Sequence, residues 1–183
     1  MIRHLIVLVL LMLLAGCVET RFESPLGDNI ETCDARWKGL WIDRDNDTTR
    51  TADAFEVDGA CELTLLDQPE PGGPLKRIRV AVNFVHDGGS DYLVVSDAQI
   101  HGLGTLDPPY GIKPAPAKSF FFVKYRLRGD VLELYEVDSE RTAGLVIDGT
   151  LDGTVSKTAG ELHVYVRGDR VKMLEIVRRQ HIF

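Results

Sequence analysis

The chain has 183 residues, of which 44% are hydrophobic, and 28 acidic against 21 basic side chains give it a formal net charge of −7 at pH 7. This length suits one domain with a hydrophobic core. The acidic balance argues against a nucleic-acid partner, because neutralising phosphates requires clustered lysine and arginine. It argues equally against adhesion of the protein surface to an anionic bilayer.

Residues 1–16 have the pattern of a secretory signal peptide. Arg3 supplies a positive charge, ten apolar residues follow without interruption, and two small residues precede Cys17. A helix needs about 20 apolar residues to span a bilayer core, so a transmembrane helix is the weaker alternative.

The stretch Leu14-Ala15-Gly16-Cys17 resembles the lipobox of bacterial lipoproteins. The resemblance implies that Cys17 receives a diacylglyceryl group, becomes the first residue after cleavage and is acylated, for example with palmitate. Val18 stands where an aspartate retains enteric-type lipoproteins in the inner membrane, so the resemblance implies the outer membrane, on its periplasmic or surface face. Two or three acyl chains anchor a protein stably. The alternative is a secreted protein with a chance cysteine near its cleavage site.

Residues 17–32 are polar after the lipidated cysteine and are predicted to form a flexible tether. One β-rich globular domain is then expected over residues 33–183. Export would expose Cys33 and Cys61 to an oxidising compartment, which makes a disulfide between them the default expectation. Two free thiols or a metal pair are the alternatives, although no Cys-x-x-Cys spacing supports a metal.

The rest of the chain has the alternation and turn signals of a β-rich protein. Strands are predicted over residues 36–42, 61–67, 75–87, 92–100, 119–127, 131–137 and 161–167. The clearest hairpin joins 119–127 to 131–137, because Gly129 and Asp130 stand between two runs of strand-forming residues. Residues 103–118 contain four prolines and are expected to form a long loop.

Two segments are candidates for helices. Residues 139–151 have Ser139 as a possible N-cap, and residues 168–183 have Asp169 at the cap position and arginines near the far end. A strand paired with 161–167 is the alternative for the second segment. The elements predict a mainly β (α+β) fold, with an antiparallel curved sheet or small β-barrel and a C-terminal helix packed on it.

Three residues at the first predicted strand, Gly39-Leu40-Trp41, resemble the Gly-x-Trp of lipocalin-like barrels. Some bacterial lipocalins are lipid-anchored, so the resemblance implies a barrel compatible with the lipobox.

The one acidic motif of the chain is formed by Asp43, Asp45 and Asp47, which occupy alternate positions as carboxylates do at the start of a calcium loop. The pattern then departs, because Thr48 replaces the expected glycine and Ala54 replaces the bidentate glutamate. A polar hairpin loop explains the same residues. These three aspartates are the weak candidates for a metal site, and no cofactor is predicted.

Other short motifs favour structure over chemistry. The sequence has no Gly-x-Ser-x-Gly elbow, no glycine-rich phosphate loop and no histidine pair at metal-ligand spacing, so no catalytic residue is predicted. Gly88-Gly89 and the Arg-Gly-Asp copies at 128–130 and 167–169, which resemble the integrin-binding tripeptide, are interpreted as turns. The consecutive phenylalanines 120–122 must point to both faces of a strand, so both faces are covered or one is a ligand or partner surface.

These observations predict a membrane-anchored lipoprotein of the bacterial cell envelope. Its domain is expected to be non-catalytic and to bind a partner protein or an apolar small molecule. The alternative is a cell-envelope enzyme or enzyme inhibitor that uses the acidic residues of the 43–47 loop. An open apolar mouth would favour ligand carriage, whereas a filled interior with an exposed apolar patch would favour a protein partner.

Overall fold

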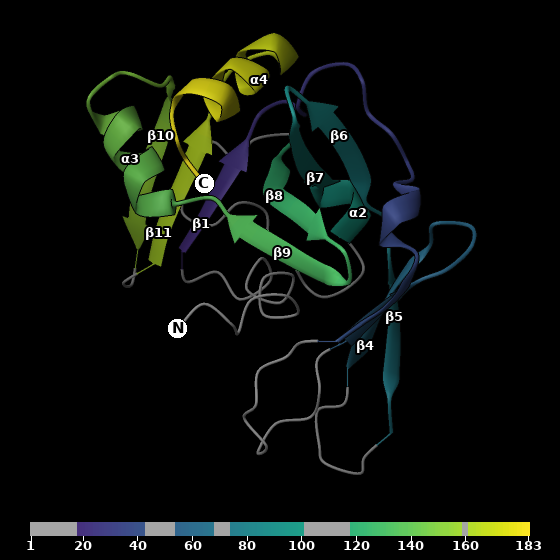
Figure 1. Cartoon of the computed structure of the whole chain (residues 1–183). Coiled ribbons are helices and arrows are strands. Elements are labelled where there is room, and N and C mark those ends of the chain that lie inside the picture. Colours follow the sequence, from purple (N-terminus) through teal and green to yellow (C-terminus); the bar gives the residue numbers. More distant parts are fainter. Residues whose placement is uncertain (1–17, 43–53, 68–73, 101–117, 159–160) are drawn as a thin grey trace.

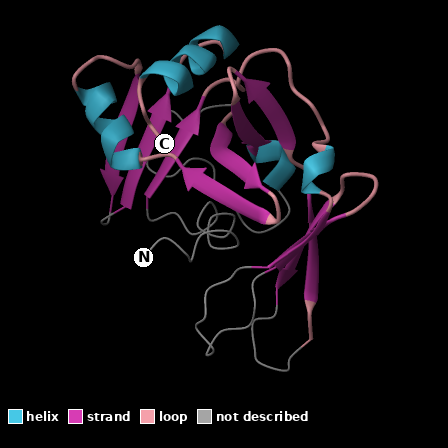
Figure 2. Ribbon diagram, in the orientation of Figure 1, coloured by secondary structure: helices cyan, strands magenta, loops and turns pink. Residues whose placement is uncertain are grey.

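The computed structural model describes residues 18–42, 54–67, 74–100, 118–158 and 161–183. In these residues the chain forms two β-sheets and a layer of helices (Figures 1 and 2). The strands are β1 (Val18–Phe22), β2 (Gly39–Ile42), β3 (Ala54–Val57), β4 (Leu63–Asp67), β5 (Lys76–Val80), β6 (Asn83–Asp87), β7 (Ser90–Ser96), β8 (Phe120–Arg128), β9 (Val131–Glu136), β10 (Gly153–Thr158) and β11 (Glu161–Val166). The helices are the 3₁₀ turn η1 (Ala35–Trp37), α2 (Asp97–Ile100), α3 (Ser139–Ile147) and α4 (Arg170–Arg179).

The larger sheet is curled and has seven strands, in the order β10-β11-β1-β8-β7-β6, with β9 paired to β8. β1 runs parallel to β11, and the other pairs are antiparallel. β1 meets β8 through Phe22 opposite Phe120, and β9 occupies the same edge of β8 from Val123 onward. Because two strands share one edge of β8, the sheet divides there and curves into a half-barrel (Figure 1).

The smaller sheet is an antiparallel meander in the order β2-β3-β4-β5. Its inner face packs on one face of the larger sheet, around Trp37, which is 1% exposed. The rings of Phe55, Phe84 and Tyr125 surround Trp37, with centroids 5.7, 5.4 and 5.0 Å away. Burial of this aromatic cluster joins the two sheets into one core.

The helices α3 and α4 cover the opposite face of the larger sheet and bury a second core (Figure 1). Phe122 belongs to this core, where its ring stacks on Phe22 at 4.1 Å between centroids, whereas Phe121 belongs to the core with the smaller sheet. Both faces of β8 are therefore covered, as one of the two sequence interpretations expected. Asp169 caps α4 by accepting a hydrogen bond from the Lys172 amide, which confirms the predicted cap.

The structure confirms the predicted fold class, mainly β with a curved sheet and a C-terminal helix. The hairpin β8–β9 turns at Gly129, and β6–β7 turns at Gly88 and Gly89, three glycines with positive φ. Such left-handed positions suit glycine in tight hairpins, so these turn predictions are confirmed.

Four local predictions are wrong. Residues 75–87 form two strands, β5 and β6, in different sheets, and residues 97–100 form helix α2 instead of continuing a strand. Residues 36–37 belong to η1, because Asp34 caps a turn before β2 begins. The cap of α3 is Asp138, whose side chain accepts from the Arg141 amide, and not Ser139.

The expected tether, 17–32, also differs from the structure. Residues 18–22 form β1 in the interior of the larger sheet, and Leu26 is fully buried in the core beneath the helices. The domain therefore includes residues that the sequence analysis placed before its start at Cys33.

Candidate functional site

An ionic network lies on β1, on the face away from helices α3 and α4. The Arg21 side chain is 2% exposed, and its Nε lies 2.9 Å from Glu19 Oε1. The Arg21 Nη1 group donates to Asp97 Oδ1 at 3.0 Å and to Ser119 Oγ at 3.3 Å, and Ser119 donates to Asp97. The guanidinium also lies over the Phe121 ring, 4.7 Å from its centroid. One buried cation thus joins the buried carboxylate of Glu19 to the partly exposed carboxylate of Asp97.

His163 extends this network to β11. Its Nδ1 lies 3.6 Å from Glu19 Oε1 and its Nε2 lies 3.4 Å from Glu161 Oε2, with the side chain 1% exposed. The parallel register places Glu19 opposite His163, which explains the juxtaposition. Since Thr20 on the other face donates to Ser139 of α3 at 2.7 Å, polar contacts hold β1 on both sides.

A second network ties the segment before β2 to the β6–β7 hairpin. Asp34, 5% exposed, accepts from Arg36 Nη2 at 2.7 Å and from the Tyr125 hydroxyl at 2.6 Å. His86 Nδ1 lies 2.7 Å from Asp91 Oδ1, and Arg36 Nη1 lies 3.1 Å from Asp91 Oδ2. Arg36 therefore joins the carboxylates of Asp34 and Asp91 at one end of the core, and His86 and Tyr125 add hydrogen-bonding groups from β6 and β8.

The His86–Asp91 pair has the geometry that orients a general base, but the hydroxyl nearest to it in this network is Tyr125. Burial and the neighbouring Asp34 raise the pKa of Tyr125 well above its ordinary value, so its hydroxyl stays protonated and is a poor nucleophile. We interpret this network as a structural latch between the loop and the hairpin.

The outer face of the smaller sheet presents two rows of apolar and charged side chains, of which Ala54 is buried and the others are partly or largely exposed. The register aligns Leu40, Glu56, Thr64 and Arg79 in one row and Ile42, Ala54, Leu66 and Arg77 in the next. We call these eight residues the outer face. Leu40 and Ile42 are 58% and 55% exposed on β2, where the strand path of this sheet ends.

Ion pairs occupy the other side of the outer face. Arg77 Nη2 lies 2.7 Å from Glu56 Oε2, and Arg79 Nε lies 2.6 Å from Glu62 Oε1. These side chains, with Asp58 and Thr64, line a hollow of about 450 Å³. An apolar edge next to a hollow of paired charges is the combination found in protein interfaces, where apolar contacts are flanked by polar groups.

The predicted cysteine pair lies beside this sheet. Cys33 precedes η1, Cys61 lies between β3 and β4, and their Cα atoms are 5.4 Å apart, within the range for a disulfide. The pair connects the β3–β4 turn to the loop that carries Asp34.

Several predicted residues lie outside the described part of the chain: Cys17, the aspartates Asp43, Asp45 and Asp47, and residues 103–117. Among the described residues, no group of three or more His, Cys, Asp or Glu side chains is placed to hold a metal ion. In the same residues no helix is long and apolar enough to cross a membrane.

The two ionic networks were not predicted from the sequence. Glu19 and Arg21 were assigned to a tether, and the partners of Asp34 lie far from it in the sequence. Glu19 and Arg21 alternate with Thr20 and Phe22, and this alternation was the available signal for a strand. Three polar residues in a row, Glu19 to Arg21, obscured it.

No protein-family model, curated protein or solved structure matches this chain. Its function is therefore inferred from its own sequence and geometry.

Proposed function

We propose that this chain is a lipid-anchored outer-membrane lipoprotein whose folded domain binds a partner protein through the outer face. The domain is non-catalytic, and its Cys33–Cys61 pair is oxidised after export. The observation that carries the proposal is the exposure of Leu40 and Ile42, side by side on β2, the strand at one end of the smaller sheet.

The packing of the domain favours a protein over an apolar small molecule. Aromatic and aliphatic side chains fill the space on both faces of β8, around Trp37 on one side and Phe122 on the other. An apolar ligand needs an enclosed apolar cavity, whereas the exposed apolar residues here lie on a sheet surface.

The charges of the outer face favour a partner with mixed polar and apolar contacts. Each arginine of the face is already paired with a glutamate, so the face has little excess charge to attract a strongly charged polymer or an anionic bilayer. Balanced pairs flanking an apolar contact give orientation and specificity to a protein complex.

The anchor and the partner surface require separate tests. For the anchor, wild-type and Cys17→Ala chains are expressed in bacterial cells and followed by flotation of membranes. We expect the wild type to float and the variant to appear in the soluble fraction. A variant that still floats with membranes would refute lipidation at Cys17.

For the partner surface, a photo-crosslinking amino acid replaces Leu40 or Ile42 in intact cell envelopes. The matched controls are Ile147 and Val171, which are 75% and 70% exposed on α3 and α4, outside the outer face. We expect a discrete crosslinked protein from positions 40 and 42 and none from the controls. We also expect Leu40→Glu to remove the adduct formed at position 42. No adduct at either position, or equal adducts at all four, would refute the proposed surface.

A further inference from the structure

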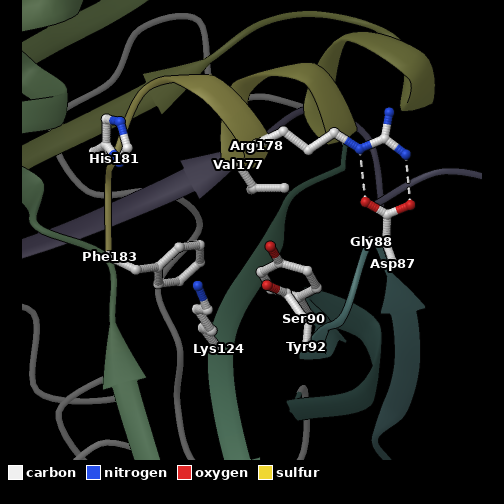
Figure 3. A pocket seen from close by; sticks show the side chains of 9 residues that line it. All are labelled: Asp87, Gly88, Ser90, Tyr92, Lys124, Val177, Arg178, His181 and Phe183. Carbon is white, nitrogen blue, oxygen red and sulfur yellow. Dashed lines mark hydrogen bonds and ion pairs between the residues drawn. The ribbon is translucent and has the colours of Figure 1, made fainter.

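A second hollow, of about 430 Å³, lies between the end of α4 and the β6–β7 hairpin, on the opposite side of the larger sheet from the smaller one. Its lining includes Ser90 and Tyr92 of β7, Lys124 of β8, Val177 of α4 and Phe183. Figure 3 shows the Lys124 ammonium between the Phe183 ring and the hydroxyl groups of Tyr92 and Ser90.

Lys124 is unusual for its place in the fold. It follows Phe122 by two residues on β8 and therefore lies on the same face, the one that the helices cover. Among the described residues, no carboxylate forms an ion pair with it, although Asp87 lines the same hollow. A lysine on a covered face without a counterion is available to bind an anion from solution.

The nearby carboxylate, Asp87, is already paired with Arg178. Arg178 Nε lies 2.7 Å from Asp87 Oδ2 and Arg178 Nη2 lies 2.5 Å from Asp87 Oδ1, in a two-point pair that points away from Lys124 (Figure 3). The pKa of Asp87 is lowered by this hydrogen bonding, so the carboxylate stays ionised and bound to Arg178. Lys124 is then a cation that can pair with a ligand in this hollow, whose lining also includes His181.

The hydroxyl groups of Tyr92 and Ser90 are further polar groups beside Lys124 in the hollow. Burial raises the pKa of Tyr92, which keeps its hydroxyl protonated and able to donate. Apolar groups adjoin these hydroxyls: the Phe183 ring packs against the Tyr92 ring, with 5.8 Å between their centroids, and Val177 also lines the hollow (Figure 3).

We propose that this hollow binds a small organic carboxylate with an aromatic or apolar body. The ammonium of Lys124 pairs with the carboxylate, the Tyr92 and Ser90 hydroxyls donate to its oxygens, and the body of the ligand lies against Phe183 and Val177. The volume of about 430 Å³ lies in the range of small-molecule sites, and polar and apolar side chains line the hollow together. The site is independent of the outer face, which lies on the other sheet.

The probe is 4-fluorobenzoate, and its neutral isostere 4-fluorobenzamide is the chemical control. Binding to the purified full-length protein in detergent is followed by broadening of the ligand's ¹⁹F resonance. We expect the benzoate to bind the wild type at least tenfold more tightly than the amide.

Substitutions test whether the benzoate binds in the hollow beside Lys124. Lys124→Met is expected to weaken benzoate binding at least tenfold and Tyr92→Phe by about threefold or more. Lys157→Met, at an exposed lysine on β10 of the same sheet, is expected to bind as the wild type does. Circular dichroism checks each fold, and Lys124→Gln replaces Lys124→Met if the methionine variant does not fold. Unchanged binding in folded Lys124 variants, or equal binding of acid and amide, would overturn the proposal.

Discussion

Replacing Arg21 with Met tests whether the buried network on β1 stabilises the fold. Methionine keeps the apolar length of the side chain but removes the cation between Glu19 and Asp97, which lie 2.9 and 3.0 Å from its nitrogens. Removing one partner of a buried ion pair costs about 3–5 kcal/mol, because the other charge is left without compensation. The loss of the contact with Phe121 adds to this destabilisation.

The free energy of unfolding is measured in urea by tryptophan fluorescence, since Trp37 is 1% exposed and reports the core. We expect Arg21→Met to lose about 3–5 kcal/mol, a large share of the about 5–15 kcal/mol that stabilises a typical domain. Adding Glu19→Gln removes one orphaned carboxylate and should recover part of the loss. This second step separates uncompensated charge from lost packing.

Arg77→Met is the matched control. Arg77 also pairs with a glutamate, at 2.7 Å, but its side chain is 59% exposed. Exposed pairs contribute about 0–1 kcal/mol, so this variant should unfold almost as the wild type does. A stabilising role for the buried cation is refuted if Arg21→Met loses no more stability than Arg77→Met, or if Glu19→Gln lowers stability further in the Arg21→Met background.

Two more variants test other contacts. Cys33→Ser should lower the free energy of unfolding of the oxidised protein by about 3–4 kcal/mol, because the bridge to Cys61 closes a loop with a sequence separation of 28. Equal urea midpoints of the wild-type protein with and without reductant would contradict this. Burial alone would raise the pKa of Asp34, but hydrogen bonds from Arg36 and Tyr125 outweigh it and lower the pKa. Asp34 therefore stabilises the fold above the pKa of an unfolded aspartate, about 4, and this contribution is lost as the pH falls through the lowered value. In Asp34→Asn, stability measured by urea unfolding should be lower at pH 7 and should decline less between about pH 5 and 2; an unchanged acid profile would count against the latch.

The sequence correctly predicted turns and helix ends that are set by one or two neighbouring residues. Gly129 sets the β8–β9 hairpin through its positive φ, and Asp169 begins α4 by capping it. Such features act over a few bonds, so the sequence around them is sufficient to predict them.

The split of residues 75–87 shows where alternation is insufficient. Val80, Val82 and Phe84 all belong to the core around Trp37, although β5 and β6 are in different sheets. The chain passes from one sheet to the other around the same core, so the alternation of buried side chains continues without a change of phase. Strand partners are decided by long-range pairing, which a local pattern does not contain.

The functional candidates Arg21 and Lys124 were also not predicted, because their burial depends on contacts with distant parts of the chain. Arg21 in a polar segment has the composition of a linker, and Lys124 in an alternating strand has the pattern of an exposed position. Both became visible only when the fold placed Arg21 between two acids and Lys124 under the helix layer. Burial of a charge is a tertiary property, and hydropathy along one segment does not reveal it.

β1 has a consequence for the order in which the domain assembles. It begins at Val18, the residue after Cys17, and pairs in parallel with β11 near the other end of the chain. In the anchored protein that we propose, the lipid holds the first residue at the bilayer, and β1 can pair with β11 only after most of the chain, up to Val166, has crossed the membrane. Completion of the larger sheet is then a late event that takes place at the membrane surface. Since one residue extends about 3.8 Å, the finished domain has almost no slack and is held close to the bilayer at this end of β1.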